Sequence, residues 1–136
     1  MIAPMRHLLL CREFPPVSGG GIGSYTARIA TLLAERGETV HVVTQRWKGA
    51  EQPRESHVDG RLVVHRVPSE QPGRTLGLRP HRAMRDPSAR ALFRSSYHPQ
   101  AFAWSAGLLA EQLVEDERID VIEAPEYEAP LYFFQL

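Results

Sequence analysis

A glycine-rich turn between a short apolar run and a helical pattern constrains the fold of this chain most. Residues 7–11 form the apolar run, residues 14–21 hold the turn, and residues 39–44 are apolar and β-branched. Between the turn and the second apolar run, the sequence has the spacing of a helix, three and four residues. One face of this helix would carry Ile22, Tyr25, Ile29, Leu32, Leu33 and Arg36. Gly37 follows where glycine commonly ends a helix. The order predicts two buried parallel strands joined by a right-handed crossover helix.

The rest of the chain continues the alternation of strands and helices. A turn at Asp59-Gly60 precedes a third strand over residues 62–67, while residues 46–57 are polar and predict a loop. Residues 101–117 predict a helix, residues 119–122 a fourth strand, and residues 127–136 the start of another helix. The sequence therefore predicts an α/β chain: a Rossmann-like open parallel sheet with helices on both faces, incomplete, with about four strands. We expect residues 1–136 to form one partial domain that stops before its later strands.

Residues 69–98 predict a long loop rich in arginine and proline, with a short helix near residues 89–95. Between Pro72 and Pro99 the only acid, Asp86, is outnumbered by Arg74, Arg79, Arg82, Arg85, Arg90 and Arg94. One interpretation is a solvated loop. The other is that residues 74–94 contact an anionic acceptor or an acidic membrane surface.

Composition excludes some classes of function. The formal net charge is zero, and the basic residues lack interleaved aromatic side chains, which disfavours nucleic-acid binding. Cys11 is the only cysteine, so no intrachain disulfide forms and a reducing compartment is favoured. With no signal-peptide pattern and no long apolar stretch, we expect a cytoplasmic domain, or one peripheral to the inner face of the membrane.

Cysteine and histidine give no reactive centre. We expect Cys11 to be a small buried side chain rather than a nucleophile, and His41 to lie within the sheet. The six histidines show no paired spacing, so we expect neither a metal site nor a cofactor.

The glycine loop consists of Gly19, Gly20, Gly21, Ile22, Gly23 and Ser24. Glycines before a helix let a backbone approach a ligand closely, and the free N–H groups attract anions, although a tight turn without a ligand explains the pattern too. The dinucleotide fingerprint fails, because its sixth position is Ser24 or Thr26 instead of glycine. The phosphate-loop motif fails because no lysine follows the glycines.

Four segments together resemble a known family. They are Glu13-Phe14-Pro15-Pro16 with the glycine loop, residues 32–44 (a helix end with Arg-Gly, then a strand), residues 59–68 and residues 120–127. Together they are similar to the retaining glycosyltransferases of the GT-B fold, of the family 4-like type. That group includes sucrose, glycogen and lipopolysaccharide sugar transferases. The resemblance implies an amino-terminal, acceptor-side domain and a nucleotide-diphosphate sugar as donor substrate.

The resemblance also implies where the site lies. The glycine loop would face a cleft, close to the donor diphosphate or the acceptor. Glu123, Glu126 and Tyr127 follow a strand, where open α/β sheets place ligands, so one of them is a candidate contact to a sugar or lipid acceptor; alternatively, Glu126 only begins a helix. Catalytic residues are expected beyond Leu136, in a carboxy-terminal donor domain from the same gene or a second chain, and the chain alone is expected to be inactive.

Two other classes of function stay open. The chain could be a non-catalytic subunit that completes an active site with a second chain, which predicts an exposed apolar face on the sheet. It could also be a small-ligand or nucleotide-binding module of flavodoxin-like type, although that fold needs further strands.

Overall fold

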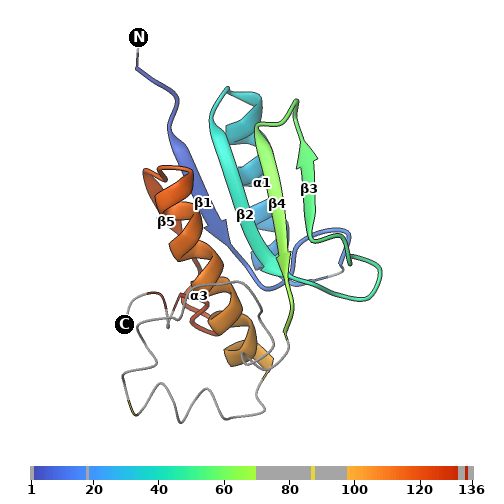
Figure 1. Cartoon of the computed structure of the whole chain (residues 1–136). Coiled ribbons are helices and arrows are strands. Elements are labelled where there is room, and N and C mark those ends of the chain that lie inside the picture. The colour runs from blue at the N-terminus through green and yellow to red at the C-terminus, as the bar shows by residue number, and fades with distance from the viewer. Residues whose placement is uncertain (1, 18, 70–86, 88–97, 132–133, 135–136) are drawn as a thin grey trace.

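The computed structural model describes residues 2–17, 19–69, 87, 98–131 and 134. These residues form an open sheet with a helix packed on each face (Figure 1). The elements in chain order are β1 (Arg6–Leu10), α1 (Gly21–Glu35), β2 (Thr39–Gln45), β3 (Arg54–His57), β4 (Leu62–Val67), α3 (His98–Asp116) and β5 (Val121–Glu123). The fold is the α/β, Rossmann-like arrangement that the sequence predicts.

The strands lie in the order β3-β4-β2-β1-β5. β1 is parallel to both β2 and β5, and β2 is parallel to β4, whereas β3 runs antiparallel to β4 at one edge. The carboxyl ends of the four parallel strands therefore share one edge of the sheet. In open α/β sheets that edge is where ligands bind.

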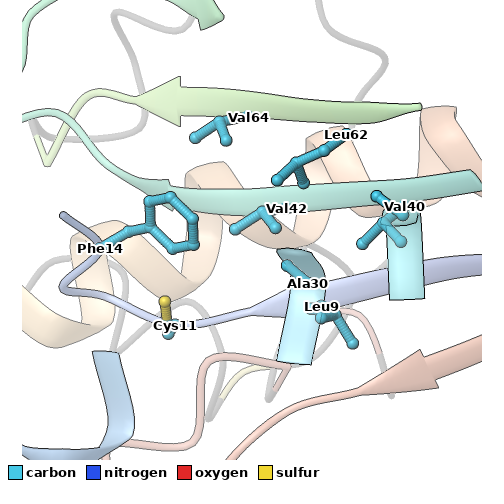
Figure 2. Packing of buried hydrophobic residues seen from close by; sticks show 9 residues of the cluster. Leu9, Cys11, Phe14, Ala30, Val40, Val42, Leu62 and Val64 are labelled. Carbon is cyan, nitrogen blue, oxygen red and sulfur yellow. The ribbon is translucent and has the colours of Figure 1, made fainter. Parts of the chain in front are cut away.

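β1 is buried on both faces, as its uninterrupted leucines predict. Leu9 packs in the cluster beneath α1 with Ala30 and Val42, part of which Figure 2 shows from close by. Leu8 and Leu10 point to the opposite face, where they pack with Phe102 of α3. Adjacent side chains of a strand point to opposite faces, so one strand supports both cores.

The face of α1 that packs on the sheet differs from the expected one. Its buried positions are Gly23, Thr26, Ala30 and Ala34, whereas the side chains of Ile22, Tyr25 and Leu32 are 38%, 53% and 44% exposed. Valines and leucines of β1, β2 and β4 already fill this side of the core, so small helix residues bring α1 close to the sheet. Ile29 and Leu33 of the expected stripe do pack against this core. The spacing of large apolar residues therefore indicates the helix and only part of its buried face.

Gly37 ends α1 as predicted. Its φ is +94°, and its N–H donates to the carbonyl of Ala34 at 3.0 Å. Glycine adopts this left-handed backbone without steric cost, and the turn returns the chain directly into β2.

The prediction of a loop over residues 46–57 is wrong at its end. Residues Arg54–His57 form β3, which raises the number of strands from the expected four to five. This strand pairs only with β4, and three of its four side chains are exposed. An edge strand that buries so little carries polar side chains, which is why no apolar pattern marks it.

The helix predicted from residue 127 does not begin there. Residues 126–131 form turns, and Glu128 and Ala129 have φ of +63° and +41°. Pro130 disfavours helical backbone at the preceding residue, so the chain turns before a helix can start.

The short helix near residues 89–95 and the six arginines of residues 74–94 lie outside the described residues. Two other predictions hold with small shifts, since residues 101–117 lie within or just beyond α3 and residues 119–122 overlap β5.

Candidate functional site

Glu13 fixes the loop between β1 and α1. The backbone N–H of Gly20 donates to Oε2 of Glu13 at 3.2 Å. A Cβ on Gly23 would overlap the backbone oxygen of Glu13, so the loop packs directly against the first turn of α1. Within the described residues, the N–H groups of Gly21, Ile22 and Gly23 have no hydrogen-bond partner. These are the donors that a helix start offers to an anion.

The side chain of Arg66 in β4 contacts the same loop. Its side chain is fully buried, donates from Nη2 to the carbonyl of Pro15 at 2.7 Å, and lies 3.3 Å from Oε2 of Glu55. Its guanidinium also lies over the ring of Phe14, 5.9 Å from the centroid. Nε and Nη1 have no partner among the described residues. A buried charge requires compensation, so this arginine ties the loop to β3 and β4.

The apolar pocket lies between the amino end of α1 and the carboxyl end of β5. Its volume is ≈ 230 Å³, and it is lined by Leu9, Leu10, Gly21, Ile22, Tyr25, Thr26, Glu123, Ala124 and Pro125. The polar side chains of this lining come from α1 and β5 alone. A mostly apolar cavity with a few polar groups is typical of a small-molecule site.

A tyrosine and a carboxylate meet at the rim of the apolar pocket. The hydroxyl of Tyr25 donates to Oε1 of Glu123 at 3.0 Å. This hydrogen bond and the negative charge of Glu123 raise the pKa of Tyr25 above its ordinary value. The hydrogen bond therefore orients the Tyr25 hydroxyl and one oxygen of Glu123.

The charged pocket adjoins the apolar one across Gly21, Ile22 and Pro125. Its volume is ≈ 420 Å³, and its further lining is Arg12, Glu13, Gly20, Gly23, Phe102, Tyr127, Glu128 and Pro130. Nη1 of Arg12 donates to both carboxylate oxygens of Glu128 at 3.0 Å. The two pockets thus form one site at the carboxyl edge of the sheet, with the glycine loop between them.

Comparison with known families decides the class of the chain. The sequence profile of the glycosyl transferase 4-like domain matches residues 20–136. The chain belongs to this family. The match begins in the glycine loop and includes α1, α3 and every strand of the sheet except β1. No curated protein matches the sequence.

Most of the predicted site residues of this glycosyl transferase 4-like domain come together. Gly20, Gly21, Ile22 and Gly23 line one or both pockets, as do Glu123 and Tyr127. Gly19, Ser24 and Glu126 line neither. The carbonyl of Glu126 accepts the N–H of Ala129 at 3.0 Å within a turn, so Glu126 begins no helix here.

Sequence reasoning misses Arg12, Glu13, Tyr25 and Glu128 as members of the site. Arg12 and Glu13 directly follow an apolar strand, at the edge where ligands bind, and this position was the available signal. The spacing of Tyr25 fits the apolar stripe of a helix, so the sequence does not mark it as a site residue. No pattern in the sequence marks Glu128 as a site residue, because its position depends on the turn at residues 126–131.

The expectations for Cys11 and His41 are confirmed. Cys11 is completely buried, and this burial raises the pKa of its thiol to about 11, so the reactive thiolate is suppressed. His41 lies in β2, with Nδ1 3.1 Å from Nε2 of His65 and their rings stacked. Neither histidine lines a pocket.

The described residues contain neither a cluster of metal ligands nor a helix that could span a membrane. No three His, Cys, Asp or Glu side chains in that part of the chain gather so that they could hold a metal ion. No helix in it is long and apolar enough to span a membrane.

Proposed function

We propose that this chain is the acceptor-side domain of a retaining glycosyltransferase that moves a sugar from a nucleotide-sugar donor to a glycan, lipid or small-molecule acceptor. Its membership of the glycosyl transferase 4-like family supports the transfer chemistry. The observation that carries the proposal is the placement between two adjoining pockets of the N–H groups of Gly21, Ile22 and Gly23, which have no partner among the described residues. Donors positioned between two cavities suit a reaction in which charge develops between two substrates.

The helix start supplies electrostatic stabilisation in this proposal. When the sugar leaves its nucleotide, the diphosphate gains negative charge, and N–H groups at a helix start favour that charge. No acidic residue lies in the first turn of α1 to oppose it. Glu13 approaches from the preceding loop and occupies only the N–H of Gly20.

The two pockets then divide the acceptor between them. Tyr25 and Glu123 offer a hydroxyl and a carboxylate oxygen at the rim of the apolar pocket, which suit the hydroxyl groups of a sugar. The exposed ring of Tyr127 borders the charged pocket. In this arrangement Glu123 and Tyr127 contact the acceptor.

The donor sugar and its nucleotide are held mainly by a carboxy-terminal donor domain, from the same gene or a second chain. One half of a cleft does not position both substrates, and positioning supplies much of the rate of a transferase. We therefore expect residues 1–136 alone to bind ligands weakly and to have little or no activity. The domain acts in the cytoplasm or against the inner face of the membrane.

A proline substitution tests the role of the helix start. Gly21 is the first residue of α1, and Gly20 before it is extended, so proline fits there while removing one N–H. Gly21→Ala is the matched control, because a Cβ at Gly21 meets nothing within 4 Å and its N–H is kept. The probe is inorganic pyrophosphate, followed by the NMR shifts of the amides of residues 20–24.

We expect Gly21→Pro to weaken pyrophosphate binding about tenfold, the size of one charge-assisted hydrogen bond, and Gly21→Ala to leave it unchanged. Equal affinities for the two variants, or shifts confined to other parts of the chain, would contradict the proposal.

A further inference from the structure

Arg12 is fixed at the carboxyl edge of the sheet by residues at and just beyond the end of β2. Its Nε donates to Oε1 of Gln45 at 3.0 Å, and its guanidinium lies 5.2 Å from the centroid of the Trp47 ring. Its carbonyl accepts hydrogen bonds from Nε1 of Trp47 at 2.9 Å and from Oγ1 of Thr44 at 3.2 Å. Each of these contacts is independent of Glu128. The guanidinium is therefore held in the wall of the charged pocket by the sheet and the segment that leaves it.

Glu128, by contrast, is held by an irregular turn. Glu128 and Ala129 both have left-handed backbone, which is costly for residues other than glycine. Within the described residues, the side chain of Glu128 makes hydrogen bonds to Arg12 alone. A turn of this kind can release the carboxylate without disturbing the sheet.

The balance of charge in the charged pocket depends on this pair. Arg12 is the only basic residue of its described lining, and the two acids are Glu13 and Glu128. Oε2 of Glu13 accepts the N–H of Gly20, so Glu128 is the counter-ion of Arg12. Both side chains of the pair keep some contact with solvent, at 23% and 16% exposure. Another oxyanion can replace the carboxylate because it leaves the guanidinium paired.

We propose that Arg12 recognises an oxyanion, a carboxylate or a phosphate, on the acceptor, and that Glu128 occupies the same position until the acceptor displaces it. This inference rests on the proposed function and specifies the acceptor as an anionic one. The guanidinium suits a carboxylate or a phosphate, and its Nη1 already donates to both carboxylate oxygens of Glu128. The acceptor oxyanion would lie in the charged pocket, and the donor diphosphate at the N–H groups of the glycine loop.

The test compares sugars with and without an oxyanion on the full chain. Glucose 6-phosphate and glucuronate are titrated beside glucose, with binding followed by NMR. The decisive variant is Glu128→Gln, which keeps the size of the side chain and removes the competing charge. Arg12→Met removes the recognising group, and Arg28→Met is the matched control, because Arg28 is exposed on α1 and lines neither pocket.

We expect the charged sugars to bind at least about tenfold more tightly than glucose, as one charge-assisted contact allows. Glu128→Gln should tighten them several-fold, Arg12→Met should reduce them to the affinity of glucose, and Arg28→Met should have no effect. Unchanged or weaker binding of the charged sugars by Glu128→Gln would overturn the inference, even if Arg12→Met failed to fold. If glucose binds as well as the charged sugars, the inference fails and the proposed function stands; if neither a sugar nor phosphatidic acid binds, both fail.

A second arm identifies where the oxyanion comes from. Vesicles containing phosphatidic acid are compared with vesicles of phosphatidylcholine alone. Preferential binding to phosphatidic acid that Arg12→Met abolishes assigns the oxyanion to a lipid acceptor. Binding of glucose 6-phosphate without any preference for phosphatidic acid assigns it to a soluble one. Binding to phosphatidic acid that persists in Arg12→Met counts against Arg12 as the recognising group.

Discussion

The hydroxyl of Tyr25 donates a hydrogen bond of 3.0 Å to Oε1 of Glu123 and so joins the first helix to the last strand. The two residues are 98 positions apart in the chain, and both are exposed to solvent. No packing requirement explains a hydrogen bond at this position, since Tyr25 is 53% exposed. Its effect is on the site: it sets the rim of the apolar pocket and the orientation of the carboxylate there.

This pair predicts an effect on the ionisation of Tyr25. Glu123→Gln removes the negative charge, so the pKa of Tyr25 should fall back towards its ordinary value. A folded pKa raised above the unfolded one gives stability that is complete below the unfolded pKa and is lost as the pH rises through the folded pKa. The measurement is an ultraviolet titration of tyrosinate, with Tyr25→Phe identifying the contribution of this residue. An identical titration of Tyr25 in Glu123→Gln would contradict the role given to the carboxylate.

The close packing of Glu13 on α1 predicts different effects for two neighbouring glycines. Gly23→Ala should destabilise the chain by about 1–3 kcal/mol, because the added Cβ would overlap the backbone oxygen of Glu13. Gly21→Ala should cost nothing, because its Cβ meets open space and alanine favours a helix. Urea unfolding of the two variants measures the difference. Equal stabilities would mean that the loop does not pack on α1 as the structure describes.

The burial of Arg66 predicts a large effect at a position outside both pockets. Arg66→Ala removes the hydrogen bond to Pro15, the contact with Phe14 and the partner of Glu55, and leaves a cavity. Changes of this kind cost about 3–5 kcal/mol. The exposed Arg28 is the control, and Arg28→Ala should change the stability by less than about 0.5 kcal/mol. A loss below about 1 kcal/mol for Arg66→Ala, measured by urea unfolding, would show that the buried guanidinium does not hold the loop.

A feature of this chain can be predicted from the sequence when its causes are local in the sequence. The strand, glycine turn, helix and second strand over residues 6–45 depend on local signals, and so their order and family resemblance could be predicted. β3 could not, because an exposed edge strand leaves no apolar pattern. The glycine loop, Glu123 and Tyr127 were candidates because the ends of parallel strands meet at one edge. Arg12 and Glu128 pair across 116 positions, and a contact of that range has no local signature.

The stacked histidines on the α3 face of the sheet predict a loss of stability in acid. His65 is partly buried beside His41, and burial with the neighbouring His41 and Arg54 lowers its pKa to about 4. Burial also lowers the pKa of His41, opposed by Glu117 and assisted by Arg54 and Arg6. The unfolded chain therefore takes up protons before the folded chain does.

The sign of this effect follows from the lowered pKa. Stability is complete above the unfolded pKa of about 6.5 and is lost as the pH falls towards the folded pKa of about 4. Between about pH 7 and about pH 5, His65 alone should reduce the free energy of unfolding by about 1–2 kcal/mol. His65→Gln should remove most of that pH dependence, whereas His57→Gln, at an exposed position on β3, should retain it. Urea unfolding of the three proteins at both pH values measures the slopes, and a His65→Gln slope equal to that of the parent chain would assign the acid sensitivity to other groups.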